Sequence, residues 1–390
     1  MKKILLLIIY FGFFSAYAQN SADFTFRILR KLEEEKKSIF VSPYSIRTIL
    51  SLCAEGASGK TLSEMNETLA LPTDANQRRK EMQINTQTFN RAKEFEILTT
   101  NTLWINKKLL LLKSYVETSK EYYQAAVKSV GFSENPEKAR KTINDFVAEK
   151  TKQMIKNLLP FGIITSETQM VLTNTIYFKA DWEKSFDKKN TKEKDFWLNE
   201  KDKKQTKMMY QKNYFAAGTY ENNQVIALPY KGGEVRMWVI LPENKDLSAL
   251  LSKMNTQMWQ NLKAATKHQE VLLTLPIFEF ETKYKMAEKL QSMGMKSAFT
   301  DVAEFPYISK GTSLKISEVI HQAKIKVEEK GTEAAAATAV VMVPKSSSMR
   351  NDMPPPPFVF TADHPFLFVI EHKSTQEILF AGTMLDPTAK

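Results

Sequence analysis

Side chains that commonly carry catalysis or bind metals are sparse in this sequence. Its four histidines are His268, His321, His364 and His372, and no two of them form a zinc-binding pair such as HxxxH. Cys53 is the only cysteine, so the chain cannot form an internal disulfide. Its apolar, helix-like surroundings favour a buried side chain over a reactive thiol or an intermolecular bridge. We therefore expect no metal site and no cofactor.

Motifs for phosphate binding or nucleophilic catalysis are also absent from the sequence. It contains no GxxxxGK[ST], no GxGxxG and no GxSxG, and Gly232-Gly233 is typical of a hairpin turn. A Ser-His-Asp triad assembles from distant positions, so the sequence alone leaves that arrangement open. The prediction is that the protein is not an enzyme.

The composition is that of a globular protein with a large core, since 43% of the residues are hydrophobic and 25% are charged. The formal net charge is +11, but the lysines are spread along the whole chain. That distribution favours a solvated basic surface, so we expect no nucleic acid partner. No stretch after residue 18 is apolar over the roughly 20 residues that a membrane helix needs. We expect a monomer without membrane association.

The N-terminus is typical of an export signal. Two lysines precede an apolar run over residues 4–14, and Ala16-Tyr17-Ala18 fits the small-x-small cleavage rule. We expect cleavage before Gln19, which removes two lysines and lowers the formal net charge from +11 to +9. Residues 1–18 are therefore expected to be a signal peptide that is removed, and the remaining protein is expected to be secreted and extracellular.

Helical periodicity dominates the first part of the chain, and strand patterns dominate from about residue 170. This order predicts an α+β fold. Length alone suggests about two or three domains. However, no linker divides the chain, so we expect residues 19–390 to form a single domain. The expected helices cover 21–36, 44–54, 62–69, 73–93, 113–126, 136–150 and 285–293, and the expected strands cover 38–43, 98–105, 170–178, 225–230, 235–241 and 270–280.

One segment, residues 329–346, combines two structural tendencies. Its alanines favour a helix, whereas Val340-Val341-Met342-Val343 favours a strand. A segment that is compatible with both is a candidate for a change of state.

Two motifs, residues 328–338 and Phe360–Ile370, resemble the hinge and the C-terminal signature of the serpins, a family of protease inhibitors. The resemblance covers nearly all of residues 21–390. Other matching motifs are Phe40–Ile46, Leu172–Trp182 and residues 225–230, 275–276, 293–295 and 319–323.

The resemblance implies a serpin fold with three β-sheets, about nine helices and an exposed reactive-centre loop over about residues 329–357. A protease cleaves this loop in serpins as it would a substrate. The loop then inserts as a new strand in the main sheet while the acyl-enzyme is intact, which traps the protease in a covalent complex. The implied function is that of a suicide-substrate inhibitor.

Residues of the expected hinge suit this insertion. With the period of two of a strand, Thr332 and every second residue after it face the core, while Glu333 faces solvent. This set holds no charged side chain, whose burial would cost several kcal/mol. Within the hinge segment, no proline occurs before Pro344. Non-inhibitory serpins often carry bulky, charged or proline residues in the hinge, so the sequence indicates an inhibitor. The hinge residues are Glu329, Gly331, Thr332, Glu333, Ala334, Ala335, Ala336, Ala337 and Thr338.

The cleaved bond lies in serpins about sixteen residues beyond the hinge glutamate, which here indicates Lys345-Ser346. A lysine fits a protease pocket with an aspartate at its base, so the expected partner is a trypsin-like serine protease. Pro344, Val343 and Met342 would add specificity. Arg350 is a weaker alternative for the cleaved bond, and Met342 or Val343 would suit elastase-like or subtilisin-like proteases.

Two positions depart from the family pattern. Lys345 lies eighteen residues before Asp363, where serpins usually have about nine. The longer loop could extend the contact with the protease. Ile277 occupies the position of a lysine that pairs with the hinge glutamate in some serpins, so that ion pair cannot form here.

The resemblance also implies structural roles in the main sheet. Ser42, Ser45, Asn174 and His321 would form a polar cluster where the central strands part, and Trp182 would lie where the hinge enters. Leaving one member of a buried hydrogen-bonded cluster unpaired costs about 1–3 kcal/mol. We therefore expect this cluster to control the opening of the sheet.

Two surface sites are weaker predictions. Asn66 begins the sequon Asn66-Glu67-Thr68, so it is a candidate glycosylation site if the host glycosylates exported proteins. Basic residues near the segment that matches the heparin-binding helix of some serpins are candidates for glycosaminoglycan binding, with a solvated helix face as the alternative. These residues are Arg78, Arg79, Lys80, Arg91 and Lys93.

The leading function is therefore a secreted inhibitor of trypsin-like serine proteases. The alternatives are a serpin that inhibits cysteine or subtilisin-like proteases, and a non-inhibitory carrier or storage serpin.

Overall fold

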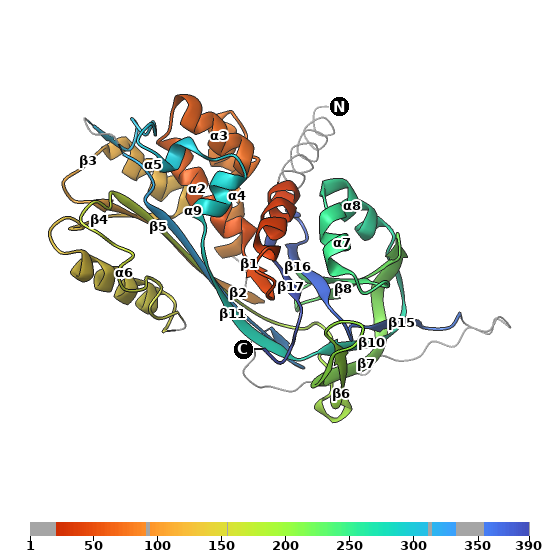
Figure 1. The fold of residues 1–390 in the computed structure, drawn as a ribbon. Coiled ribbons are helices and arrows are strands. Elements are labelled where there is room, and N and C mark those ends of the chain that lie inside the picture. Colours follow the sequence, from red (N-terminus) through yellow and green to blue (C-terminus); the bar gives the residue numbers. More distant parts are fainter. Residues whose placement is uncertain (1–20, 91–93, 154, 311–313, 333–354, 390) are drawn as a thin grey trace, which may run out of the picture.

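The structure is a computed structural model that describes residues 21–90, 94–153, 155–310, 314–332 and 355–389 (Figure 1). These residues form nine α-helices, 17 strands and two short 3-10 turns. Three sheets contain the strands. The predicted α+β class, with three sheets and about nine helices, is confirmed for this part of the chain.

The main sheet has six strands, and its two longest strands lie next to each other. Its order is β11 (Phe278–Lys285), β13 (Glu318–Val327), β14 (Gly331–Thr332), β5 (Met170–Asp181), β2 (Phe95–Asn106) and β4 (Ala126–Val130). β13 and β5 also pair directly and in parallel, from Glu318 opposite Val171 to Lys324 opposite Tyr177. We call this line of pairing the seam. The two-residue strand β14 lies between β13 and β5 beyond the end of the seam.

A second sheet of nine strands packs against the main sheet through an aromatic core. Its order is β1 (Ile39–Val41), β17 (Ile378–Met384), β16 (Phe366–His372), β9 (Val235–Pro242), β8 (Asn223–Pro229), β7 (Lys203–Tyr220), β10 (Lys267–Pro276) and β15 (Phe358–Thr361), with β6 (Lys192–Trp197) paired to β7. Phe178 of β5 lies 5.6 Å from Phe380 of β17, and Phe278 of β11 lies 5.7 Å from Phe368 of β16, measured between ring centroids. The third sheet pairs β12 (Ser309–Lys310) with β3 (Leu110–Leu111).

One group of helices is gathered at one end of the main sheet (Figure 1). It includes α2, whose residues 43–54 are all buried. α6 covers the seam, because Ile143 and Val147 pack in one cluster with Val171 of β5 and Ile320 of β13. The helices are residues 21–33, α2 (Pro43–Glu55), α3 (Gly59–Leu69), α4 (Ala75–Asn90), α5 (Lys113–Tyr123), α6 (Pro136–Lys150), α7 (Leu247–Lys253), α8 (Thr256–Ala264) and α9 (Ala287–Ser292).

Helix starts follow local capping. Ser42 caps α2 by accepting a hydrogen bond from the Ser45 N–H, and Pro43 fills the first helical position, where no N–H is needed. Asp246 and Asn255 cap α7 and α8 in the same way. The sequence analysis missed α7 and α8, although these two caps were visible in the sequence.

Two strand predictions differ from the structure for a physical reason. The expected strand over 270–280 is two strands, because the chain passes from the nine-stranded sheet to the main sheet at Ile277. The long strand β7 was missed because lysines and other polar residues occupy its exposed positions, and its apolar alternation is weak. Cys53 is fully buried, as expected. No helix among the described residues is long and apolar enough to cross a membrane.

Candidate functional site: the hinge and the seam

Strand β14 brings the first hinge residues into the main sheet. Gly331 lies opposite Asp181 and Thr332 lies opposite Ala180 of β5, both antiparallel, and Thr332 also pairs with Val327 of β13. Thr332 is 1% exposed, and its hydroxyl lies 2.7 Å from the Tyr230 hydroxyl. The first member of the predicted core-facing set therefore faces the core.

Gly331 is required by a close approach of two backbones. A Cβ atom at this position would lie 2.2 Å from the Ala180 carbonyl oxygen, well inside contact distance. Any larger residue would push β14 away from β5. The glycine therefore lets the hinge enter between the two strands.

Trp182 lies at the entrance, where the sequence analysis expected it. Its indole N–H donates to the Glu328 carbonyl at 3.0 Å, and its backbone N–H donates to the Lys330 carbonyl at 2.8 Å. Its ring stacks on Tyr230 with the centroids 4.4 Å apart. Tyr230, whose pKa burial raises well above the usual value, was missed because only the fold brings it to the hinge.

The Glu329 carboxylate has a partner other than the lysine found in some serpins. The Thr191 hydroxyl donates to it at 2.9 Å, and the Phe186 N–H donates to the Glu329 carbonyl at 2.8 Å. The absence of a lysine at Ile277 is therefore compensated from the segment that precedes β6.

The four residues predicted to form a polar cluster are brought together at the seam. His321 of β13 lies opposite Asn174 of β5, and its Nδ1 is 2.5 Å from the Asn174 amide oxygen. The Ser42 N–H donates to His321 Nε2 at 3.1 Å, so the proton of the neutral ring is on Nδ1. The Asn174 amide also donates to the Ser45 hydroxyl. We call Ser42, Ser45, Asn174 and His321 the seam cluster.

The seam cluster also binds two neighbouring strands. The Ser42 hydroxyl donates to the Leu379 carbonyl of β17 at 2.6 Å, and the Asn174 amide contacts the Asn101 amide oxygen of β2 at 2.5 Å. Sequence analysis missed Asn101, because a cross-strand partner depends on the register. Burial lowers the pKa of His321 to about 3, so the ring stays neutral and can accept from Ser42.

Separating β5 from β13 must break the hydrogen bond between His321 and Asn174. The seam is otherwise held by parallel backbone pairing and by apolar side chains on both faces: Leu172 and Val319 face the helical core, and Val171 and Ile320 face α6. The site can therefore admit a strand only after this polar cluster has rearranged.

The predicted cleavage site and most of the predicted hinge lie outside the described residues. This applies to Glu333, Ala334, Ala335, Ala336, Ala337, Thr338, Met342, Val343, Pro344, Lys345, Ser346 and Arg350. The chain resumes at residue 355 and enters β15, which pairs in parallel with β10 from Phe358 opposite Val271. The segment that carries Lys345 thus connects β14, at the end of the seam, with the edge of the nine-stranded sheet.

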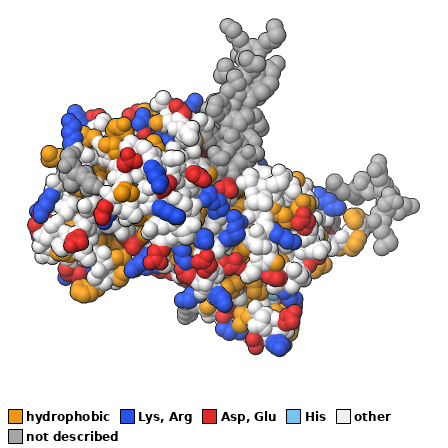
Figure 2. All heavy atoms as spheres, turned by 45° about the horizontal axis from the view of Figure 1, so that its top comes forward, with side chains coloured by type: hydrophobic (Ala, Val, Ile, Leu, Met, Phe, Trp, Pro, Cys, Tyr) orange, Lys and Arg blue, Asp and Glu red, His pale blue; other side chains and the backbone are white. Residues whose placement is uncertain are grey.

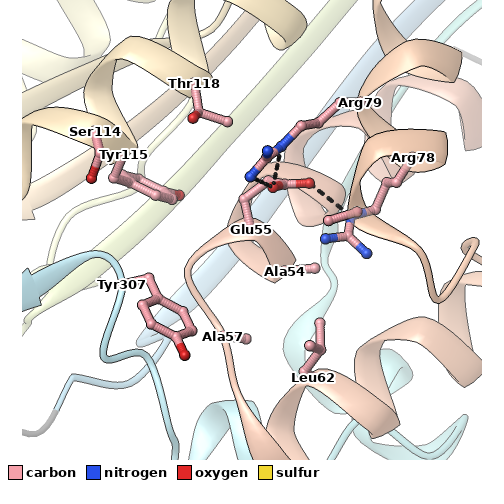
Figure 3. A pocket seen from close by; sticks show the side chains of 11 residues that line it. Ala54, Glu55, Ala57, Leu62, Arg78, Arg79, Ser114, Tyr115, Thr118 and Tyr307 are labelled. Carbon is pink, nitrogen blue, oxygen red and sulfur yellow. Dashed lines mark hydrogen bonds and ion pairs between the residues drawn. The ribbon is translucent and has the colours of Figure 1, made fainter.

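The structure contradicts a glycosaminoglycan site that uses Arg78. Arg78 is 2% exposed, and its Nε lies 2.8 Å from the buried carboxylate of Glu55 (Figure 3). Arg79 contacts the same carboxylate at 2.7 Å, and Tyr123 donates to it. The two arginines therefore neutralise a buried acid beside a pocket of about 340 Å³ between α2, α4 and α5.

Lys80 is exposed, whereas Arg91 and Lys93 lie outside the described residues. Basic and acidic side chains are interspersed over the face in Figure 2, as expected for a solvated charged surface. The glycosaminoglycan prediction is wrong for Arg78, because residue spacing did not reveal which face of α4 is buried.

The structure also contradicts glycosylation at Asn66. This side chain is 9% exposed on α3, and Thr68 of the sequon is 1% exposed. A glycan on the amide nitrogen needs open solvent, which the folded protein does not provide there. The sequon motif has no information about burial, so the prediction failed.

A main sheet with two parallel central strands, a hinge strand between their ends and a return strand on a second sheet define a serpin fold. The family profile described as Serpin (serine protease inhibitor) matches residues 19–387, and the chain belongs to the serpin family. Members of this family generally have target proteases as their partners.

Individual relatives support this membership. An uncharacterized serpin-like protein of Methanosarcina acetivorans is 34% identical over 375 residues, which cover 95% of this chain and 86% of that protein. Human Serpin B3 is also 34% identical, over 96% of this chain and 100% of the relative. Human thyroxine-binding globulin has a TM-score of 0.87 at 27% identity, with 97% of this chain and 100% of that chain covered.

Proposed function

We propose that this serpin is a secreted suicide-substrate inhibitor of trypsin-like serine proteases that is cleaved at Lys345-Ser346. The observation that carries the proposal is β14: the hinge is already paired between β5 and β13, beyond one end of the seam. The residues after Thr332 can extend this strand in the same register, because Thr332 already pairs with Ala180.

The composition of the next residues supports insertion. Thr332 faces the core, so the period of two places Ala334, Ala336 and Thr338 on the same side. These small side chains would pass between β5 and β13 with little displacement of neighbours. Glu333 would face the other side, where its charge can remain hydrated.

Inhibition follows from the order of two steps. The protease serine attacks the Lys345 carbonyl, forms an ester, and releases the amine of Ser346 with the C-terminal part of the loop. The freed N-terminal part then inserts into the seam with the protease attached. Antiparallel pairing on both sides of the new strand replaces the single parallel pairing of β5 with β13, so insertion gains backbone hydrogen bonds.

Secretion as a monomer is part of the proposal. The family match begins at residue 19, so residues 1–18 are outside the serpin domain, which supports their role as a signal peptide.

Two alternatives rest on specific observations. The first is a serpin that inhibits cysteine or subtilisin-like proteases, and Met342 or Val343 would suit a subtilisin-like enzyme. The similarity to thyroxine-binding globulin favours a carrier without inhibitory activity. The small residues of the hinge argue against this second alternative.

A panel of trypsin-like, subtilisin-like and cysteine proteases separates the three functions. Each protease is mixed with the protein, and the products are separated in SDS. We expect a covalent complex with trypsin-like enzymes. A complex only with another class would support the first alternative, and cleavage in the loop without any complex would support a non-inhibitory serpin.

A further inference from the structure

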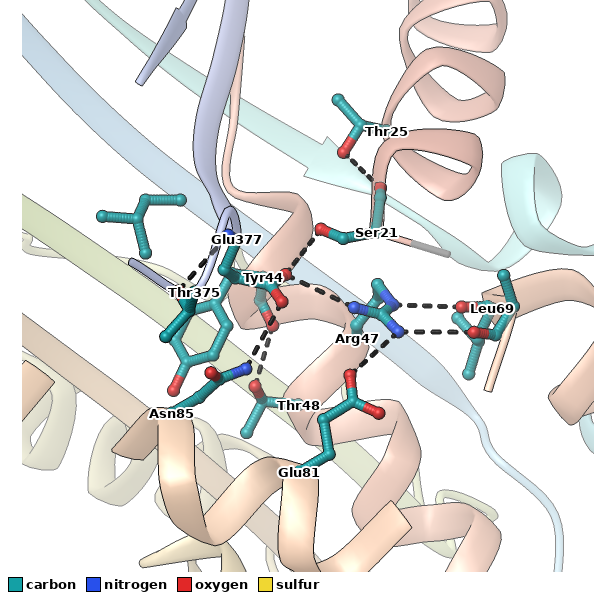
Figure 4. Close-up of polar contacts among 12 residues, drawn as sticks. Ser21, Thr25, Tyr44, Arg47, Thr48, Leu69, Glu81, Asn85, Thr375 and Glu377 are labelled. Atoms are coloured by element: carbon teal, nitrogen blue, oxygen red, sulfur yellow. Dashed lines mark hydrogen bonds and ion pairs between the residues drawn. The ribbon is translucent and has the colours of Figure 1, made fainter. Parts of the chain in front are cut away.

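Three ionisable side chains are buried together between α2, α4 and the start of β17 (Figure 4). Arg47, Glu81 and Glu377 are 1%, 3% and 2% exposed. Arg47 Nη1 lies 3.3 Å from Glu377 Oε1, and Arg47 Nη2 lies 3.5 Å from Glu81 Oε1. Two carboxyl groups therefore share one guanidinium group. We call Arg47, Glu81 and Glu377, together with Ser21 and Asn85, the Arg47 cluster.

The two carboxyl groups have unequal partners. Glu377 accepts from the Ser21 hydroxyl at 2.6 Å and from the Asn85 amide at 3.3 Å, in addition to Arg47. Glu81 has only the longer contact with Arg47, and its Oε2 has no hydrogen-bond partner among the described residues although it is buried. Hydrogen bonds from several donors stabilise the ionised form of a carboxyl group, and Glu81 lacks them, so its buried side chain favours the protonated form.

Among the neighbouring titratable groups, only Arg78 adds a weak positive influence on Glu81 beyond that of Arg47. Arg78, on the same helix as Glu81, is engaged by Glu55, and Arg79 contacts that carboxylate too. Tyr44 lies near Glu377, and burial raises its pKa to about 12, so it is neutral. His372 is close to Glu377 in the chain, and burial lowers its pKa to about 4, so it is also neutral.

Arg47 cannot move toward Glu81 without losing other partners. Its Nε donates to the Leu69 carbonyl at 3.0 Å, and its Nη2 donates to the Ala70 carbonyl at 3.3 Å. The guanidinium group is therefore fixed at the end of α3. An ionised Glu81 would remain a second buried negative charge on α4.

We propose that the Arg47 cluster is a proton-dependent latch, in which protonated Glu81 holds α4 against α2 and ionised Glu81 releases it. This inference concerns the regulation of the fold and does not depend on the proposed inhibitory function. α4 leads within a few residues into β2, which pairs with β5 along the main sheet. Glu377 lies two residues before Leu379, whose carbonyl accepts from Ser42 of the seam cluster. The latch thus shares α2 and the start of β17 with the seam cluster and its contacts.

The pH range of the latch follows from the direction of the shift. Burial raises the pKa of Glu81 to about 7; the Glu377 charge adds to this increase, whereas Arg47 and, to a smaller extent, Arg78 oppose it. Between the usual glutamate pKa and about 7, the folded state binds a proton that the unfolded state releases. Stability therefore falls as the pH rises through this range, and the latch is open above it.

The proposal is tested by thermal unfolding of the whole protein from about pH 5.5 to about pH 8.5. Glu81→Gln keeps the shape of the protonated side chain and removes the titration. We expect the unfolding temperature of the wild type to fall by several degrees across this range relative to Glu81→Gln. Glu117→Gln on the exposed face of α5 is the matched control and should follow the wild type. An equal fall in the wild type and Glu81→Gln would overturn the proposal.

A second measurement on the wild type covers the case in which Glu81→Gln does not fold. Infrared spectroscopy detects the C=O stretch of a protonated carboxyl group buried in a protein. We expect this band at about pH 6 and its loss at about pH 8.5, with lower protection of the α4 amides at the higher pH once their exchange is corrected for the intrinsic rate at each pH. Absence of the band at the lower pH, or exchange in α4 that does not respond to its loss, would contradict the latch.

Discussion

His321 connects two strands and a helix with a single neutral ring. It contacts Asn174 across the seam and accepts from the Ser42 N–H at the start of α2. Its lowered pKa has a consequence for acid stability. Between the usual histidine pKa and about 3, the unfolded state binds a proton that the folded state does not, so the stabilisation by neutral His321 is lost as the pH falls.

We predict that His321→Ala lowers the temperature at which the protein polymerises on heating. The substitution leaves two buried groups unpaired, each costing about 1–3 kcal/mol, and weakens the seam. Light scattering during heating measures the effect. His268→Ala, at an exposed position of β10, is the control and should not change the temperature. An unchanged temperature for His321→Ala would count against a role of the cluster in holding the sheet closed.

Arg78 and Lys80 are a pair of neighbouring cations with different expected effects. Arg78→Ala removes a buried partner of Glu55, and we predict a loss of about 3 kcal/mol in the free energy of unfolding. Lys80→Ala changes an exposed side chain and should stay within about 0.5 kcal/mol of the wild type. Urea unfolding measures both values. Equal effects would show that the pair of Arg78 with Glu55 has no structural importance.

At the residue scale, family motifs predicted side chains better than did charge spacing. Trp182 and the seam cluster were located because their motifs fix their positions on strands. Their partners Tyr230 and Asn101 were missed, since contacts between distant segments depend on register. Arg78 and Asn66 were misjudged because a motif or a run of charges does not reveal which face of a helix is buried.

At the scale of elements, β14 is the fixed start from which the inserted strand grows in the proposed mechanism. Thr332 is buried beside Tyr230, so an arginine there would place a charge inside the sheet at a cost of several kcal/mol. We predict that Thr332→Arg converts the protein from an inhibitor into a substrate: the protease still cleaves the loop but escapes. The ratio of cleaved protein to SDS-stable complex measures this change.

The matched control for that variant is Glu333→Arg. The period of two places residue 333 on the opposite face from Thr332, so its charge should leave inhibition intact. If Thr332→Arg forms as much complex as Glu333→Arg does, the insertion register is wrong.

Strong local patterns made most elements predictable, and weak ones did not. The long apolar run of β5 and the capped start of α2 were clear from the sequence. The boundary between β10 and β11 was not, because one continuous strand pattern spans two sheets. Period and propensity describe a strand but do not specify the sheet to which it belongs.

At the scale of the whole molecule, the structure places both ends of the segment that carries Lys345: one beside the closed seam and one at the edge of the nine-stranded sheet. The hinge is paired at Thr332, and the chain returns at β15 on the other sheet. The seam cluster and the Arg47 cluster are both anchored on α2, one beside the main sheet and one beside α4. Cleavage at Lys345 would free the loop to enter the seam.

The most direct test of this account is the reaction of the wild type and of Lys345→Ala with trypsin. The account predicts an SDS-stable complex with the wild type, a released peptide whose N-terminus is Ser346, and no such complex with Lys345→Ala. Complete cleavage after Lys345 with fully active trypsin and no complex would contradict inhibition by loop insertion.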